Sequence, residues 1–250
     1  MSQTIPNVLS RHAEEAAFLW LLRNRAVDLP HFALRQLAGL DQRVEAHLDG
    51  LRVAGEAGWL RAWKEFEDFT GPGEAFCAAS LAFEAADPGR MQALLDAVGT
   101  KRNLGRAVAS AIGWLSDGDS ELVLSLLQNW GTPAARGIAI AGAALRRTTI
   151  PANILEAGLR DPLSRGRTIT AVAELGLTSF ISALRRYLAD PDAGIRADAA
   201  WAITRLSPDR QAFQELQTIA MVESWSRRRS ATMVVRRLEP AAARKWVEML

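Results

Sequence analysis

An arginine, replaced once by a glutamate, opens an alanine-rich stretch about every 31 residues along this chain of 250 residues. The clearest unit is residues 190–206, DPDAGIRADAAWAITRL, and residues 161–175, DPLSRGRTITAVAEL, match it. The successive spacings between marks are 31, 32, 30, 31, 29 and 33 residues. So regular a period is typical of repeat proteins. The marks are Arg43, Glu74, Arg106, Arg136, Arg167, Arg196 and Arg229.

Each period contains two stretches with helical spacing. The stretch before a mark has apolar residues such as Phe180, Leu184 and Leu188, and the stretch after it is rich in Ala, Gly and Ser. Turns with Gly and Pro, such as residues 71–73, separate the stretches. No segment alternates apolar and polar residues as a strand would. We therefore expect an all-α chain that folds as an α-solenoid, a right-handed superhelix of about seven helix pairs.

The repeats leave no boundary within the chain, so residues 1–250 are predicted to form a single repeat domain. Residues 1–30 contain one helical stretch without a mark, and they are expected to cap the array. Residues 240–250 resemble the first helix of a further unit. They either cap the array or lead into a natural chain that continues beyond Leu250.

Composition excludes several classes of protein. Cys77 is the only cysteine, so no intramolecular disulfide and no thiolate zinc site are expected, and the reducing cytoplasm is the expected compartment. Neither a signal peptide nor a membrane-spanning run is present in the sequence. Residues 1–125 hold 12 Lys/Arg and 17 Asp/Glu, a balance of −5, and residues 126–250 hold 18 and 11, a balance of +7. Such a charge dipole can orient an encounter with a charged partner.

The sequence shows no catalytic constellation, so no enzyme activity, cofactor or metal is expected. The three histidines, His12, His31 and His47, lack the spacing of a helical metal site. Phosphate-loop and nucleophile-elbow motifs are absent. Cys77 lies among small apolar residues and is expected to be a buried, inert thiol. The acidic run at residues 65–68 is interpreted as a solvated helix face.

Two groups of residues are candidates for binding. Asp198, Trp201 and Arg205 have helical spacing and share one face of the second helix of their unit. Trp201 is either an exposed contact for a partner or packed against the neighbouring unit. The second group is the densest basic patch, flanked by tryptophans, and arginine suits carboxylates or phosphates because its planar fork makes paired bonds. The patch comprises Arg227, Arg228, Arg229, Arg236, Arg237, Arg244 and Lys245, with Trp225 and Trp246 beside it. Its candidate binding residues are Trp225, Arg227, Arg228, Arg236 and Arg237.

The unit DPDAGIRADAAWAITRL resembles the HEAT repeat in a compact bacterial form, which makes the expected solenoid one of HEAT-like helix pairs. HAEEAAFLWLLRNRAV at His12–Val27 and LDQRVEAHLDGLRVAG at Leu40–Gly55 resemble the start of a bacterial HEAT-like family encoded beside type VI secretion genes. The resemblance extends over essentially the whole chain. It implies an accessory role near secreted effectors or the spike apparatus, and it carries over no catalytic residues.

The expected function is a non-enzymatic scaffold, adaptor or chaperone that binds a protein, either a secretion component or an effector. Neither a membrane nor nucleic acid is an expected partner. The alternative is a HEAT-like alkylpurine DNA glycosylase that binds DNA in a concave groove, with Asp198 and Trp201 beside the C-terminal arginines. A basic charge confined to one half of the chain speaks against it, because phosphate contacts require charge along the groove. A repeat-array lyase for bilin chromophores is a more distant reading.

Overall fold

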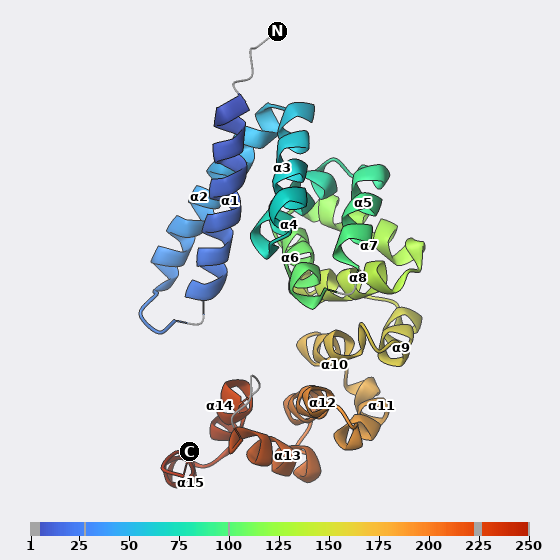
Figure 1. Ribbon diagram of the computed structural model, residues 1–250. Coiled ribbons are helices and arrows are strands. Elements are labelled where there is room, and N and C mark those ends of the chain that lie inside the picture. Colours follow the sequence, from blue (N-terminus) through green and yellow to red (C-terminus); the bar gives the residue numbers. More distant parts are fainter. Residues whose placement is uncertain (1–5, 28, 100, 223–226, 250) are drawn as a thin grey trace. The chain divides into compact units, whose positions relative to one another are not determined.

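The computed structural model describes residues 6–27, 29–99, 101–222 and 227–249, and every regular element within these ranges is a helix (Figure 1). The predicted all-α class is therefore confirmed. The chain divides into two compact units, Met1–Arg146 and Arg147–Leu250. A single repeat domain over residues 1–250 stays a prediction.

The first unit opens with two long helices, α1 and α2, which pack against each other. α1 also contacts α3 and α4, so it covers the beginning of the helix pairs that follow. The described helices of this unit are α1 (Pro6–Ala26), α2 (Leu34–Val53), α3 (Glu56–Phe69), α4 (Pro72–Glu84), α5 (Pro88–Val98), α6 (Arg102–Ile112), α7 (Asp117–Trp130) and α8 (Pro133–Arg146).

The alanine-rich helices form the centre of the first unit. α4 packs on α6 and α6 packs on α8. Small residues allow this close approach: a Cβ atom on Gly142 of α8 would lie 2.6 Å from the Ile112 side chain at the end of α6. Aromatic rings fill the larger spaces, because Phe76 of α4 stacks on Trp20 of α1 and meets the Trp114 ring edge-on. The small side chains thus bring helices together, and the rings complete the core.

The second unit continues with shorter helices. α10 packs on α9 and α12, and α12 packs on α13 and α14. Its core is largely aliphatic, with Ile169, Ile203 and Leu216 fully buried. The described elements are α9 (Ala152–Arg160), α10 (Arg165–Glu174), the 3₁₀ helix η1 (Thr178–Phe180), α11 (Ile181–Arg185), the 3₁₀ helix η2 (Arg186–Ala189), α12 (Ala193–Leu206), α13 (Arg210–Ala220), α14 (Arg227–Arg237) and α15 (Pro240–Val247).

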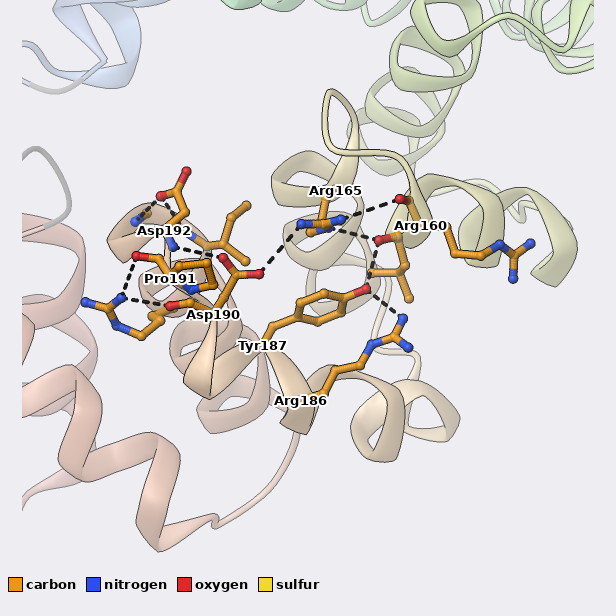
Figure 2. Close-up of polar contacts among 11 residues, drawn as sticks. Arg160, Arg165, Arg186, Tyr187, Asp190, Pro191 and Asp192 are labelled. Carbon is orange, nitrogen blue, oxygen red and sulfur yellow. Dashed lines mark hydrogen bonds and ion pairs between the residues drawn. The ribbon is translucent and has the colours of Figure 1, made fainter.

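The Asp-Pro turns of the second unit are held by a polar network (Figure 2). The hydroxyl of Tyr187, the only tyrosine, donates to the Leu159 carbonyl at 2.8 Å and accepts from Arg186 at 2.7 Å. Arg165 donates to the same Leu159 carbonyl at 3.1 Å and faces Asp190 at 3.6 Å. The network joins the end of α9 to the turn before α12, so it fixes how successive helix pairs meet.

The mark residues take part in the same turns. Arg196 donates to the carbonyls of Asp190 and Pro191 at 2.8 and 3.1 Å, and Arg136 donates to the Gly131 carbonyl at 2.9 Å. Six of the seven marks lie in the first five residues of a helix. In the two repeats marked by Arg136 and Arg196, the recurring arginine therefore secures the turn that leads into the alanine-rich helix.

Three local predictions differ from the structure. Arg43 opens no helix but lies within α2, because Leu40, Val44 and Leu48 continue one buried stripe with no Pro to end it. The segment around Phe180 is not one helix but the series η1, α11 and η2. The acidic run at residues 65–68 is not wholly solvated, because Glu65 is buried and paired with Arg61.

Candidate binding surface in the second unit

Asp198, Trp201 and Arg205 lie side by side on α12, and the structure adds Arg229 of α14 to them. Arg229 donates to the Asp198 carboxylate at 3.0 Å. The Arg229 guanidinium carbon also lies 3.7 Å from the centre of the Trp201 ring, and that of Arg205 lies 5.5 Å from it. This geometry is that of a cation–π contact between neighbouring helices. Trp201 is half-buried, which agrees with packing against the neighbouring repeat, here through Arg229 of α14.

The buried side of this cluster has a structural role. Asp198 is only 9% exposed and lies against Gly166 of α10, where a Cβ atom would come within 3.0 Å of its carboxylate. Burial lowers the pKa of Arg229, and the negative charge of Asp198 opposes that shift. Asp198 shares a face of α12 with Arg205 as predicted but not its exposure, because the Asp198 carboxylate holds α14 on α12.

Arginines at helix ends bind the carbonyl groups at the end of the preceding alanine-rich helix. Arg205 Nε donates to the Ala173 carbonyl at 3.1 Å, and Arg237 donates to the Thr204 carbonyl at 2.6 Å. Arg146 makes a related contact in the first unit, donating to the Leu115 carbonyl in the turn after α6 at 3.1 Å. The last carbonyls of a helix lack intrahelical partners and carry partial negative charge, so arginine stabilises them.

An open groove of about 560 Å³ runs along these helix ends within the second unit. Its volume falls in the range of about 300–1,000 Å³ found for ligand pockets. Basic side chains and apolar side chains line it together, with one carboxylate. We call it the arginine groove and define it by Arg147, Ala173, Glu174, Leu175, Gly176, Arg205, Leu206, Met233, Arg236 and Arg237.

The four arginines of the groove form no ion pair with any carboxylate in the described ranges. Arg147 and Arg236 are exposed and also form no hydrogen bond there. Arg205 and Arg237 are exposed but anchored to carbonyls, as described above. Glu174, the one carboxylate of the groove, pairs with Arg167 at 2.7 Å. The groove therefore presents an excess of positive charge to solvent.

The described residues of the predicted basic patch do not all lie in the arginine groove. Arg236 and Arg237 lie in the arginine groove with Arg205. Arg228 is an exposed residue of α14 outside the groove. Trp225 and the side chain of Arg227 lie outside the described residues. Trp246, expected to flank the patch, is a buried residue of α15 and presents little surface.

Sequence reasoning missed Arg147 and Glu174. Arg147 follows the end of α8 as part of an Arg-Arg pair, and Arg236 belongs to another such pair at the end of α14. A double arginine at the end of an alanine-rich helix was the available signal. No sequence signal indicated Glu174, because its place in the groove depends on helices that are distant in sequence.

Other reactive side chains lie in the first unit. His12 of α1 and His47 of α2 approach with their Nδ1 atoms 3.2 Å apart, a pairing that their separation of 35 residues did not indicate. Cys77 is buried as predicted, and this burial raises the pKa of its thiol to about 12, which disfavours the reactive thiolate. Within the described ranges no cluster of three His, Cys, Asp or Glu residues could hold a metal ion. In the same ranges, no helix has the length and apolar character needed to cross a bilayer.

Comparison of the chain with protein-family models, with curated proteins and with solved structures finds no match.

Proposed function

We propose that this protein is a non-enzymatic adaptor whose HEAT-like helix pairs form a right-handed α-solenoid and whose arginine groove binds an acidic partner protein. Polar contacts between residues that lie one repeat apart support the interpretation of the chain as a repeat array. The separations are 31 residues for Arg229 and Asp198, 32 for Arg205 and Ala173, and 33 for Arg237 and Thr204. These separations match the sequence period, as stacking of equivalent helices would require.

The observation that carries the binding proposal is the charge of the groove. Four arginines line one open surface, and none is neutralised by a described carboxylate. Guanidinium groups left without a carboxylate partner in the folded chain favour binding of a negatively charged ligand. Arginine is also among the residues that contribute most to protein interfaces.

The glycosylase alternative gains no support from Asp198. A catalytic carboxylate must reach the substrate, and this one is buried and bound to Arg229 at 3.0 Å. A duplex also needs phosphate contacts over its length, whereas the groove gathers its charge at three helix ends. We therefore keep the adaptor as the proposed function, with a bacterial type VI secretion component or effector as the partner that the sequence resemblance implies.

The test is affinity capture from nuclease-treated lysate of the native host. The double variant Arg147→Glu with Arg236→Glu reverses two groove charges that have no hydrogen bond or ion pair in the described ranges. Its control, Arg244→Glu with Lys245→Glu, makes the same change in net charge on exposed residues of α15 outside the groove.

We expect the wild type and the control to retain the same acidic protein and the groove variant to lose it. Equal retention by the groove variant would show that the partner binds elsewhere. Capture of nothing but nucleic acid in a parallel sample without nuclease would contradict the adaptor proposal itself.

A further inference from the structure

We infer that the arginine groove takes a short acidic segment in which an apolar side chain stands between carboxylates. The inference rests on the proposed function and specifies its ligand. It follows from how apolar and charged groups are distributed along the groove, and it concerns one class of partner, an acidic peptide.

The apolar part of the groove consists of Leu175, Leu206 and Met233. Met233 is nearly buried at 8% exposure, whereas the two leucines are half-buried and keep apolar surface in contact with water. Burying such surface under a ligand is favourable. A purely charged ligand would leave this apolar surface uncovered or trap it beneath polar groups.

Two of the arginines are held in position before any ligand arrives. Arg205 is fixed through its Nε, which donates to the Ala173 carbonyl at 3.1 Å. Arg237 is fixed through one terminal nitrogen, which donates to the Thr204 carbonyl at 2.6 Å. Each therefore keeps further N–H donors for a ligand. A guanidinium already ordered by the fold loses less conformational entropy when it binds a carboxylate bidentately.

Carboxylates suit the groove better than the phosphates of a nucleic acid. The groove lies at the C-terminal ends of α10, α12 and α14, where the helix carbonyls carry partial negative charge. Glu174 adds a carboxylate to the same surface. Phosphate sites instead favour helix N-termini, which offer N–H groups. A short acidic segment can place its few charges on the arginines alone, whereas a phosphate backbone would also pass the carbonyls and Glu174.

The experiment measures binding of a labelled, end-blocked peptide Glu-Glu-Leu-Glu-Glu to the full chain by fluorescence anisotropy, at low and high salt. Three further probes are compared with it. The first replaces the central Leu by Gly, the second replaces every Glu by Lys, and the third is a single-stranded oligonucleotide of equal charge. The groove variant Arg147→Glu with Arg236→Glu and the α15 variant Arg244→Glu with Lys245→Glu are titrated in parallel.

We expect the Leu peptide to bind about tenfold more tightly than the Gly peptide, since the leucine side chain adds apolar burial. The groove variant should lose about tenfold or more of that affinity, and the α15 variant should lose little. The Lys peptide should not bind.

Equal affinity for the Leu and Gly peptides would overturn the apolar anchor. Tighter binding of the oligonucleotide would overturn the acidic-peptide class. Either result can occur while affinity capture still depends on the groove, and the proposed function would then stand with a different ligand. If the groove variant keeps both the captured protein and its affinity for the peptide, the arginine groove is not the binding site, and the proposed function fails as well.

Discussion

Arg52 in the first unit and Arg236 in the second both lie near the C-terminal end of a helix, and their surroundings differ. Arg52 donates to the carboxylates of Glu45, Asp49 and Glu84 at 2.5–2.8 Å. The hydrogen bonds that Arg52 donates to Glu84 are the largest influence on the Arg52 pKa, which is raised. Arg236 has no hydrogen bond or ion pair among the described residues.

Other arginines of the first unit are also neutralised by carboxylates. Arg90 pairs with Glu56, and Arg146 pairs with Asp117. In the second, the four arginines of the groove face no described carboxylate other than Glu174, which is paired with Arg167. The comparison teaches that helix-end arginines stabilise the fold where carboxylates neutralise them, and remain available for a ligand where carboxylates are absent.

The cluster at Asp198 provides the largest expected effect. Asp198→Ala leaves Arg229 without its carboxylate, and we expect the free energy of unfolding to fall by about 2 kcal/mol. This is below the cost for a fully buried pair, because the Arg229 side chain keeps 33% exposure. Denaturant titration followed by circular dichroism measures the loss. Glu248→Ala, at an exposed site, is the control. Equal stability of the two variants would show that the Asp198 pair does not hold α14 on α12.

Replacing Arg52 tests the neutralised side of the comparison. Arg52→Met keeps the apolar stem but leaves three carboxylates close together, and we expect a loss of about 1–2 kcal/mol in the free energy of unfolding. The same denaturant titration measures it. The matched control, Arg236→Met, should change stability by less than about 0.5 kcal/mol. Similar losses for both variants would remove the proposed difference between the neutralised Arg52 and the unpaired Arg236.

The turn network of Figure 2 gives a smaller effect. Tyr187→Phe removes the hydroxyl that donates to the Leu159 carbonyl at 2.8 Å. We expect a loss of about 1 kcal/mol, the usual contribution of one buried hydrogen bond. Thermal unfolding monitored by circular dichroism reports it. An unchanged unfolding temperature would mean that Arg165, which donates to the same carbonyl, suffices to hold the turn.

The histidine pair of the first unit predicts a small pH dependence. Burial, and then the charge of His12, lowers the pKa of His47 below its ordinary value of 6.5; Glu15 opposes the shift and Arg43 adds to it. The unfolded chain then binds more protons below pH 6.5, so stability present above that pH is lost as the pH falls. His47→Gln should flatten this decline, and His31→Gln, at an exposed site, should not. Unfolding measured at several pH values would contradict the account if both variants kept the wild-type slope.

Much of the fold could be predicted because helical spacing and small residues are local signals. On the apolar side of α12, Ala199, Ala202 and Ile203 are fully buried as their spacing indicates, whereas Leu206 on the same side is half-buried and lines the groove. The turn before Arg196 could also be predicted, because aspartate is a common residue at the start of a helix. Asp192 caps α12 by accepting from the amides of Gly194 and Ile195. The period of about 31 residues matched the beginnings of most alanine-rich helices.

The candidate site was only partly predictable because its geometry depends on neighbouring helices. Spacing placed Asp198 and Trp201 on one side of a helix, but it could not show that Arg229 covers that side. An α12 helix packed between α10, α13 and α14 has little exposed surface left. The groove joins Arg147 to Arg236, which are 89 residues apart, and the sequence period alone does not show that they line one surface.

The most direct measurement determines both the unfolding free energy and the affinity for the Glu-Glu-Leu-Glu-Glu peptide on two variants, Arg52→Met and Arg147→Glu with Arg236→Glu. The account predicts opposite outcomes. Arg52→Met loses stability and keeps its affinity, whereas the groove variant keeps its stability and loses about tenfold or more in affinity. A groove variant that unfolds more easily but binds the peptide as the wild type does would contradict the claim that these arginines serve a partner.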